Sequence, residues 1–376
     1  MRSSQRVLAV AAAFGLLFTA CGSSSKESSG TDAAATTAAG SAATAAPDAA
    51  TKIKACEVTD TGGIDDKGFN QIAFAGLQQA ESKLGAEIVS LESASDADYA
   101  PNIQAMIDQK CDVIVTVGFL LDGASVEAAK ANPNQQMGIV DSGGMDNNGT
   151  PDDFADDKAI ANLRSILFSV GEPSFVAGYI AAGMTKSGTV GTYGGINIPP
   201  VVAFMDGYLK GVNHYNEVHK TSVKVLGWDG KDGSFAGNFQ NLDDGKKLAQ
   251  AQVDSGADIV FPVAGPVGLG SSALALELGP EKLSIIGVDL DMYVSNEKEK
   301  SVYLTSVLKN IDVAVFDTIK GVADTGKVSA GYMGTFANGG VGIAPFHDFD
   351  GKVSAELKGE VEKLIADLTS GAMKIG

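Results

Sequence analysis

Short apolar runs alternate with longer amphipathic runs along most of the chain. The run at residues 53–58 is typical of a strand, and after it Ala73, Leu77, Ala80 and Leu84 recur at helical spacing. Further strands are predicted at 87–91, 113–117 and 138–140, and further helices at 99–110 and 124–131. This alternation predicts parallel sheets covered by helices, which is an α/β fold.

A second series of strands and helices follows residue 170. A helix is expected from Gly171, and strands are predicted at 189–193, 223–226, 259–263 and 284–288. The chain after residue 52 has about 325 residues, which exceeds the size at which a single hydrophobic core usually stops growing. We therefore expect two lobes. An amphipathic run at 353–368 predicts a last helix, but the sequence does not indicate which lobe it joins.

The N-terminal segment, residues 1–21, has the features of a secretory signal. Arg2 and Arg6 precede an apolar run at 7–20 that is too short to span a bilayer. The run ends in Leu-Phe-Thr-Ala-Cys, which resembles a bacterial lipobox, so Cys21 is expected to be lipidated as the new N-terminus. The alternative is an ordinary signal peptide that is cleaved near Ala20.

Residues 22–52 are mostly Ser, Ala, Thr and Gly. A segment with almost no large apolar side chain cannot bury enough surface to offset the entropy lost on ordering. We expect a flexible tether that holds a soluble domain on the extracytoplasmic face of a cell membrane, through the lipid alone. No later stretch of the sequence is long and apolar enough to predict a transmembrane helix.

Charge and motifs exclude several classes of function. The formal net charge is −18, and it becomes −20 when residues 1–21, with two Arg and no acid, are removed. Such a surface repels phosphates, so no nucleic acid is expected as a partner. The sequence has no Gly-x-Gly-x-x-Gly after the first strand, no P-loop and no Gly-x-Ser-x-Gly elbow. His214, His219 and His347 have no catalytic or metal-binding spacing. We expect neither an enzyme nor a cofactor, and no metal.

Two cysteines remain in the folded part. Cys56 and Cys111 each stand at the start of an apolar run. In the doubly wound strand order 2-1-3-4-5, the first and third strands are neighbours, so the two thiols would lie close enough to form a disulfide in an oxidising compartment. The alternative is two buried free thiols.

The loop after the first predicted strand carries the groups that a flat polar ligand requires. Asp60 is an acceptor at the strand tip, Phe69 offers an aromatic face, and Asn70 can donate and accept hydrogen bonds. Asp141 follows another strand and should face the same crevice, because ligands bind at the carboxyl ends of the strands in open α/β sheets. The alternative is a glycine turn with a core Phe and an Asn cap. The adjacent acids Asp65 and Asp66 are expected to be solvated.

Several segments, in the same order, resemble the basic membrane protein family of lipoproteins, the purine-nucleoside receptors of ABC transporters. The resemblance covers about residues 54–325 and is carried by the sequences TDTGGIDDKGFNQ at 59–71, GNFQNLDDGK at 237–246, IGVDLD at 286–291 and LTSVLKN at 304–310. It implies a type I periplasmic-binding-protein fold, with two doubly wound Rossmann-like lobes joined by a hinge. The expected N-terminal lobe is 53–170 plus 289–327, and the expected C-terminal lobe is 171–288 plus 328–376.

The resemblance also implies a ligand site. Phe69 and Phe239 would stack on either side of a base, while Asp289, reinforced by Lys309, would hold the ribose hydroxyls. Gly265 lies in a glycine-rich loop at 264–270 that lets backbone approach the ligand. Residues 228–236 form extra chain that includes a literal Gly-Ser-Phe, so Trp228 and Phe235 remain alternatives to Phe239.

The expected function is capture of a nucleoside, in particular a purine nucleoside, by hinge closure. The ligand would then pass to a membrane permease powered by a separate ATPase, and the receptor itself would be a monomer. Three alternatives stay open: a receptor for another small polar molecule such as a sugar, a ligand-sensing lipoprotein without a transporter, and an enzyme.

Overall fold

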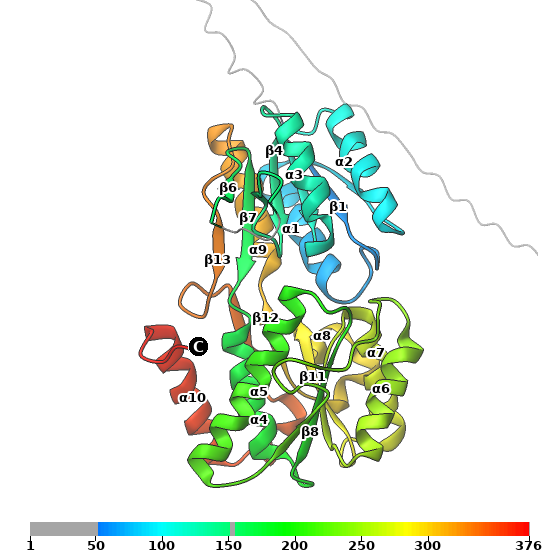
Figure 1. Cartoon of the computed structure of the whole chain (residues 1–376), viewed down its shortest axis with the longest axis vertical. Helices are drawn as coiled ribbons and strands as arrows, with labels where there is room; N and C mark the ends of the chain where they lie inside the picture. The colour runs from blue at the N-terminus through cyan, green and yellow to red at the C-terminus, as the bar shows by residue number, and fades with distance from the viewer. Residues whose placement is uncertain (1–51, 151–154, 376) are drawn as a thin grey trace, which may run out of the picture. The chain divides into compact units, whose positions relative to one another are not determined.

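A computed structural model describes residues 52–150 and 155–375, which form two α/β lobes (Figure 1). The predicted signal segment, its Cys21 and nearly all of the predicted tether lie outside the described residues. Within the described ranges, none of the helices combines the length and the apolar character needed to cross a membrane.

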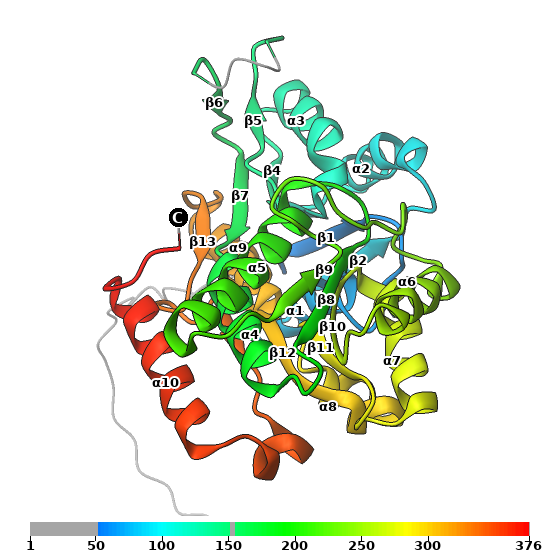
Figure 2. The same cartoon turned by 60° about the horizontal axis from the view of Figure 1, so that its bottom comes forward.

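The N-terminal lobe is built on a six-stranded parallel sheet of order β13-β7-β4-β3-β1-β2. Its first five strands along the chain have the predicted order 2-1-3-4-5. The strands are β1 Lys54–Thr59, β2 Glu87–Leu91, β3 Val113–Val117, β4 Gln136–Val140, β7 Leu163–Phe168 and β13 Tyr332–Gly334. A two-stranded hairpin, β5 Met145–Asp146 and β6 Lys158–Ala159, extends from this lobe (Figure 2).

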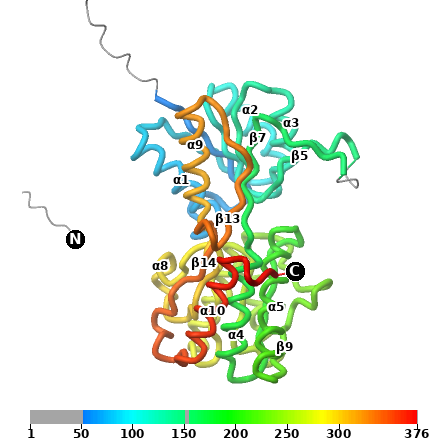
Figure 3. The backbone as a smooth tube through the Cα atoms, turned by 90° about the vertical axis from the view of Figure 1, so that its left-hand side faces the viewer, coloured from blue at the N-terminus to red at the C-terminus, as the bar shows by residue number. Residues whose placement is uncertain are grey.

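Helices cover both faces of this sheet. α1 Phe69–Leu84 and α9 Ile311–Thr325 pack together on one face (Figure 3), and α2 Tyr99–Asp108 and α3 Asp122–Ala131 lie on the other. The two sides bury separate apolar clusters, so the strands are apolar on both faces, as expected for a parallel sheet between helices.

The C-terminal lobe has a second six-stranded sheet of order β14-β12-β11-β10-β8-β9, in which only β14 is antiparallel to its neighbour. Its strands are β8 Thr189–Gly194, β9 Lys224–Leu226, β10 Ile259–Val263, β11 Ser284–Asp289, β12 Tyr303–Lys309 and β14 Val341–Ile343. The helices are α4 Gly171–Met184, α5 Pro199–His219, α6 Leu242–Asp254, α7 Gly268–Leu278, α8 Met292–Ser295 and α10 Ala355–Ser370. The predicted last helix is therefore α10, and it packs on α4 of this lobe.

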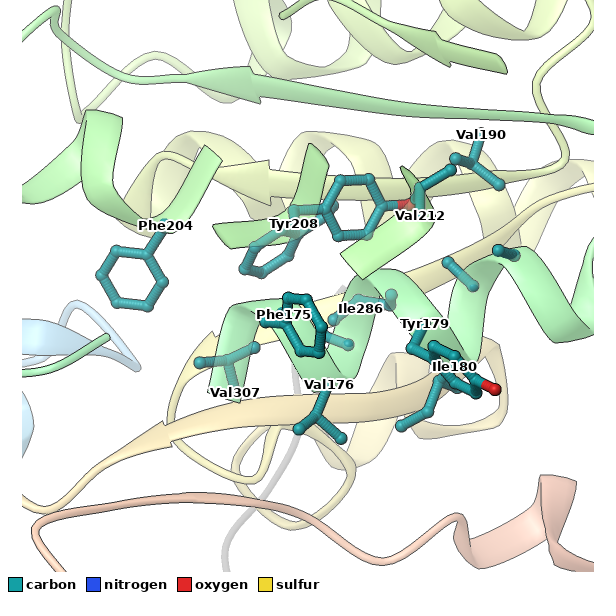
Figure 4. Packing of buried hydrophobic residues seen from close by; sticks show 14 of the residues in the cluster. Phe175, Val176, Tyr179, Ile180, Val190, Phe204, Tyr208, Val212, Ile286 and Val307 are labelled. Carbon is teal, nitrogen blue, oxygen red and sulfur yellow. The ribbon is translucent and has the colours of Figure 1, made fainter. Parts of the chain in front are cut away.

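The helix pair α4 and α5 forms the centre of the C-terminal lobe core. Phe175 of α4 and Tyr208 of α5 pack between the two helices and the sheet (Figure 4). The helices approach so closely that a Cβ atom on Gly178 would lie 2.1 Å from the carbonyl oxygen of Tyr208, and one on Gly211 would lie 1.9 Å from that of Phe175. Glycine at both positions thus holds α5 firmly against the lobe.

Two of the three predicted crossings between the lobes are wrong. The first crossing lies between β7 and α4, near residue 170. The second was expected near 288, but β12 pairs in parallel with β11, so residues 289–309 stay in the C-terminal lobe and the chain crosses between β12 and α9. The third was expected near 328, but β13 pairs with β7 in the N-terminal lobe, and the crossing lies between β13 and β14.

The strand β12 is absent from the predicted strands because Thr305 and Ser306 interrupt its apolar run, although both side chains are buried.

A disulfide joins Cys56 of β1 to Cys111, which lies two residues before β3, with their Cα atoms 6.0 Å apart. Because both residues are buried and the bond closes a loop of 55 residues, the chain-entropy model gives it a stabilisation of about 4 kcal/mol. We expect one cross-linked peptide containing both cysteines in mass spectra of non-reduced digests of protein made in an oxidising compartment. Two alkylatable thiols in that protein would contradict this prediction.

Candidate ligand-binding site

A cleft between the two lobes is lined by all eight residues that the sequence assigned to ligand binding. These residues are Asp60, Phe69, Asn70, Asp141, Phe239, Gly265, Asp289 and Lys309. Four of them, Asp60, Asp141, Asp289 and Lys309, stand at or directly after the carboxyl ends of parallel strands, and the others lie in the loops or at the helix starts that follow. The topology thus brings together groups that are up to 249 residues apart, from Asp60 to Lys309.

The N-terminal wall is a network around the start of α1. The Nδ2 of Asn70 donates a hydrogen bond of 2.9 Å to Oδ1 of Asp60. The carboxylate of Asp66 accepts from the backbone N–H groups of Gly68, Asn70 and Gln71, at 2.8 to 3.0 Å. Asp66 therefore satisfies free N–H groups at the helix start and holds the backbone that carries Phe69 and Asn70.

The expectation that Asp65 and Asp66 are both solvated is wrong for Asp66. Its side chain is buried and lines the cleft, because it folds back onto the helix start, whereas Asp65 is exposed. An Asp shortly before an amphipathic helix was the available signal for this role.

Gly118 makes room for the carboxylate of Asp60. It follows β3 with φ +116°, and a Cβ atom there would lie 2.5 Å from Oδ2 of Asp60. The sequence did not indicate Gly118, because its contact comes from a neighbouring strand rather than from nearby residues.

The two aspartates at the ends of β4 and β11, Asp141 and Asp289, both have φ +66°. This left-handed conformation is uncommon outside glycine, although Asp tolerates it better than most residues. Both residues line the cleft. Oδ1 of Asp289 is buried without a hydrogen-bond partner among the described residues.

Burial raises the pKa of two cleft carboxyls. The pKa of Asp289 is raised to about 7, mainly by loss of solvent, and the nearby ammonium of Lys309 opposes the rise. The pKa of Asp60 is also raised to about 7 by burial, against the hydrogen bond from Asn70. Both groups therefore change protonation near neutral pH.

Lys309 forms an ion pair with Asp141, in which Nζ contacts Oδ2. Only 2% of the lysine side chain is exposed. Its Nζ lies 4.7 Å from the ring centroid of Phe69 and 5.3 and 5.8 Å from those of Phe168 and Phe204. The support of Asp289 by Lys309 that the resemblance implied is electrostatic only: the ammonium opposes the rise in the pKa of Asp289, whereas its ion-pair partner is Asp141, which belongs to the other lobe.

The C-terminal wall contains Phe239, Gly265 and the apolar start of α5. Of the three aromatics that the sequence left open, Phe239 lines the cleft. Trp228 donates from Nε1 to Oδ1 of Asp206 at 2.8 Å and meets Phe235 edge-to-face at 6.2 Å, and neither ring is part of the cleft lining. Phe204 also lines the cleft. This role could not be predicted from the sequence, because Phe204 is one apolar residue among several in its helix.

The cleft can accept several hydrogen bonds and stack flat groups. It has four carboxyl groups, from Asp60, Asp66, Asp141 and Asp289, against the single ammonium of Lys309. In the described ranges, His, Cys, Asp and Glu side chains form no group of three or more that could hold a metal ion. Hydroxyl and N–H donors on a planar ligand match this set of acceptors.

Two α/β lobes joined by three crossings around a cleft of aromatic rings and acceptors define a solute-binding protein of the periplasmic type. The family model described as ABC transporter substrate-binding protein PnrA-like, Bmp, matches residues 53–370. The chain therefore belongs to this family, as its resemblance to basic membrane proteins implied.

Individual relatives agree with this assignment. The chain is 32% identical over 342 residues to the ABC transporter nucleoside-binding protein BmpA of Lactococcus lactis, covering 86% of this chain and 89% of that protein. It is 31% identical over 325 residues to an uncharacterized lipoprotein of Pyrococcus abyssi, covering 84% and 74%. A solute-binding protein of an ABC transporter system from Aeropyrum pernix has the same fold, with a TM-score of 0.75 at 24% identity over 86% of this chain and 93% of that one.

Proposed function

We propose that the protein captures purine nucleosides for an ABC transporter. The proposal depends on the composition of the cleft. Its lining includes Phe69 from one lobe, Phe239 from the other, and Asp289, whose buried Oδ1 has no hydrogen-bond partner among the described residues. The Lactococcus lactis relative, whose name includes nucleoside binding, supports the same ligand class.

The base is held by stacking and by the N-terminal wall. A planar heterocycle between Phe69 and Phe239 gains contact on both faces. Oδ1 of Asn70 is buried without a hydrogen-bond partner among the described residues, and Oδ2 of Asp60 is free of the Asn70 contact. Both atoms accept hydrogen bonds, so they suit the N–H groups of a base edge.

The ribose is held by Asp289. A carboxylate can accept protons from two vicinal hydroxyls, and these charge-assisted bonds satisfy the orphaned Oδ1. The ammonium of Lys309 offsets part of the cost of burying this carboxylate.

Delivery requires other proteins. The loaded receptor passes its ligand to a membrane permease with a separate ATPase, and it acts as a monomer without catalysis or a cofactor. A lipid on Cys21 and the tether at 22–52 keep it at the extracytoplasmic face of the membrane.

Calorimetry against purine and pyrimidine ribonucleosides, 2′-deoxynucleosides, free bases and sugars tests the proposal. We expect purine ribonucleosides to bind most tightly, because loss of one hydroxyl leaves a buried charged acceptor partly unpaired, at a cost of about 1–3 kcal/mol. Tight binding of a sugar without a base would replace the proposal with a sugar receptor. Continuous heat from turnover would indicate an enzyme.

The stacking residues give a mutational prediction. Phe239→Ala should weaken nucleoside binding by about tenfold or more, because one stacked base–aromatic contact contributes roughly 1–3 kcal/mol. Phe235→Ala is the matched control: it removes a nearby ring that packs on Trp228 outside the cleft lining, and we expect less than a twofold change. The opposite ranking in titration calorimetry would contradict the placement of the base against Phe239.

A further inference from the structure

The end of β8 holds the loop that carries Phe239. The N–H of Gly195 donates to the carbonyl oxygen of Val263 at 2.9 Å, and its own carbonyl accepts from the N–H of Gly237 at 2.8 Å. The carbonyl of Gly194 accepts from the N–H of Ala236 at 2.9 Å. The loop is thus hydrogen-bonded to the strand end two residues before Phe239.

Two aromatic rings rest on these two glycines. A Cβ atom on Gly194 would lie 2.6 Å from the ring of Phe235. One on Gly195 would lie 2.2 Å from Cε1 and 2.3 Å from Cδ1 of Phe239. Only the second ring lines the cleft, so the backbone of Gly195 supports one of the two proposed stacking faces.

We propose that Gly195 is the positioning residue for Phe239 and thereby sets the gap that admits a flat base; this inference rests on the proposed nucleoside function. Ordinary van der Waals contact between carbons begins near 3.5 Å, so a methyl group at 195 displaces the ring by about 1 Å. The loop hydrogen bonds restrain its backbone, so the ring, a movable side chain, takes up the displacement. The two aromatic faces then no longer match the thickness of one base.

Asn238 keeps the loop from following the displaced ring. Its Oδ1 accepts from the N–H groups of Gln240 and Asn241, at 3.0 and 2.7 Å, and its Nδ2 donates to the carbonyl of Ala236 and to Asp244, each at 3.2 Å. These bonds fix the backbone on both sides of Phe239. Gly195 and the Asn238 turn therefore define where the ring can lie.

The test is a double-mutant cycle with Gly195→Ala and Phe239→Ala, measured by calorimetry with a purine ribonucleoside and by thermal unfolding. Gly195→Ala alone should raise Kd at least tenfold. In the Phe239→Ala background, where the obstructing ring is absent, it should change Kd less than twofold. Most of any loss of Tm should be recovered, because the remaining close contact of the methyl group is 3.1 Å to the carbonyl oxygen of Asn238. A purely structural role would give the same loss in both backgrounds.

The outcomes separate failure of the proposed nucleoside function from failure of the positioning role of Gly195. If wild type binds no nucleoside, the proposed function fails. If wild type binds and Gly195→Ala binds equally well, or if the losses in the two backgrounds are equal, the positioning role is overturned. If Gly195→Ala does not fold, recovery of folding by Phe239→Ala supports the contact, and failure to recover refutes it. Gly194→Ala, which meets Phe235 instead, controls for loop damage, since its effect on Tm should persist in the Phe239→Ala background.

Discussion

Replacing Lys309 with methionine is expected to destabilise the fold by about 3–5 kcal/mol and to abolish measurable nucleoside binding. The substitution keeps the length of the side chain and its aromatic neighbours but leaves Asp141 without its cation inside the cleft. Breaking a buried ion pair by removing one partner typically has a cost of this size, because the remaining charge is uncompensated. Denaturant unfolding and calorimetry measure the two effects.

Two further variants separate charge from packing. Asp141→Asn combined with Lys309→Met removes both charges and should recover most of the stability, without recovering binding. Lys320→Met removes an exposed i,i+4 partner of Asp324, and it should change stability by less than about 1 kcal/mol. Equal destabilisation by Lys309→Met and Lys320→Met would contradict the structural role of the buried pair.

Nucleoside binding is expected to release protons and to weaken as the pH falls below about 7. Burial raises the pKa values of Asp60 and Asp289 to about 7, so both carboxyls gain protons as the pH falls through neutrality. Ligand donors favour the ionised carboxylates and therefore lower both pKa values in the complex. Affinity is then constant above pH 8 and falls as the pH passes below the pKa of the free groups, by up to about tenfold per group per pH unit.

Titration calorimetry at pH 7 in buffers of different ionisation enthalpy counts the released protons. We expect up to about one proton for the two carboxyls together if both pKa values fall from about 7 to well below 7 in the complex. Asp289→Asn should release fewer, since one titrating group is gone. Zero proton exchange together with a flat affinity from pH 5.5 to 8 would show that the ligand does not bond to these carboxyls.

The same groups make the protein without added nucleoside more stable at low pH. A carboxyl whose folded pKa lies above its unfolded value of about 4 binds a proton more tightly in the native state. The stability that this gives is present at low pH and is lost as the pH rises from about 4 to 7. Comparing the unfolding free energies of wild type and Asp289→Asn at pH 5 and 8 isolates the contribution of one of these groups.

The fold was largely predictable because the lobes are built from strands that are apolar on both faces and helices with clear spacing. β1, β3 and β10 lack charged residues at most positions and have turn residues beside them, so their positions and the strand order follow from the sequence. β12, β13 and β14 were not predictable in this way. They are short or contain Thr, Ser and Gly, and only pairing with distant strands makes them part of a sheet.

The site was predictable where the chemistry is local or follows a motif. Asp60, Phe69 and Asn70 lie within eleven residues of each other, and Asp289 and Lys309 carry a recognisable motif. Other features of the site depend on contacts between separate elements. They are the ion pair of Lys309 with Asp141, the close approach of Asp60 to Gly118, and the position of Phe204 in the cleft lining. No spacing along the chain records such contacts, and so the ion pair of Lys309 with Asp141 could not be predicted from the sequence.

Strand β12, which the sequence did not predict, determines which charged residues of the cleft stay together when the lobes separate. Because β11 and β12 are neighbours in one sheet, Asp289 and Lys309 travel together, whereas Asp141 belongs to the opposite lobe. Separation of the lobes is therefore expected to break the ion pair between Lys309 and Asp141 and to keep Lys309 near Asp289. Lys309 is thus expected to change its main carboxylate partner with the state of the receptor, from Asp289 when the lobes are apart to Asp141 when they are together.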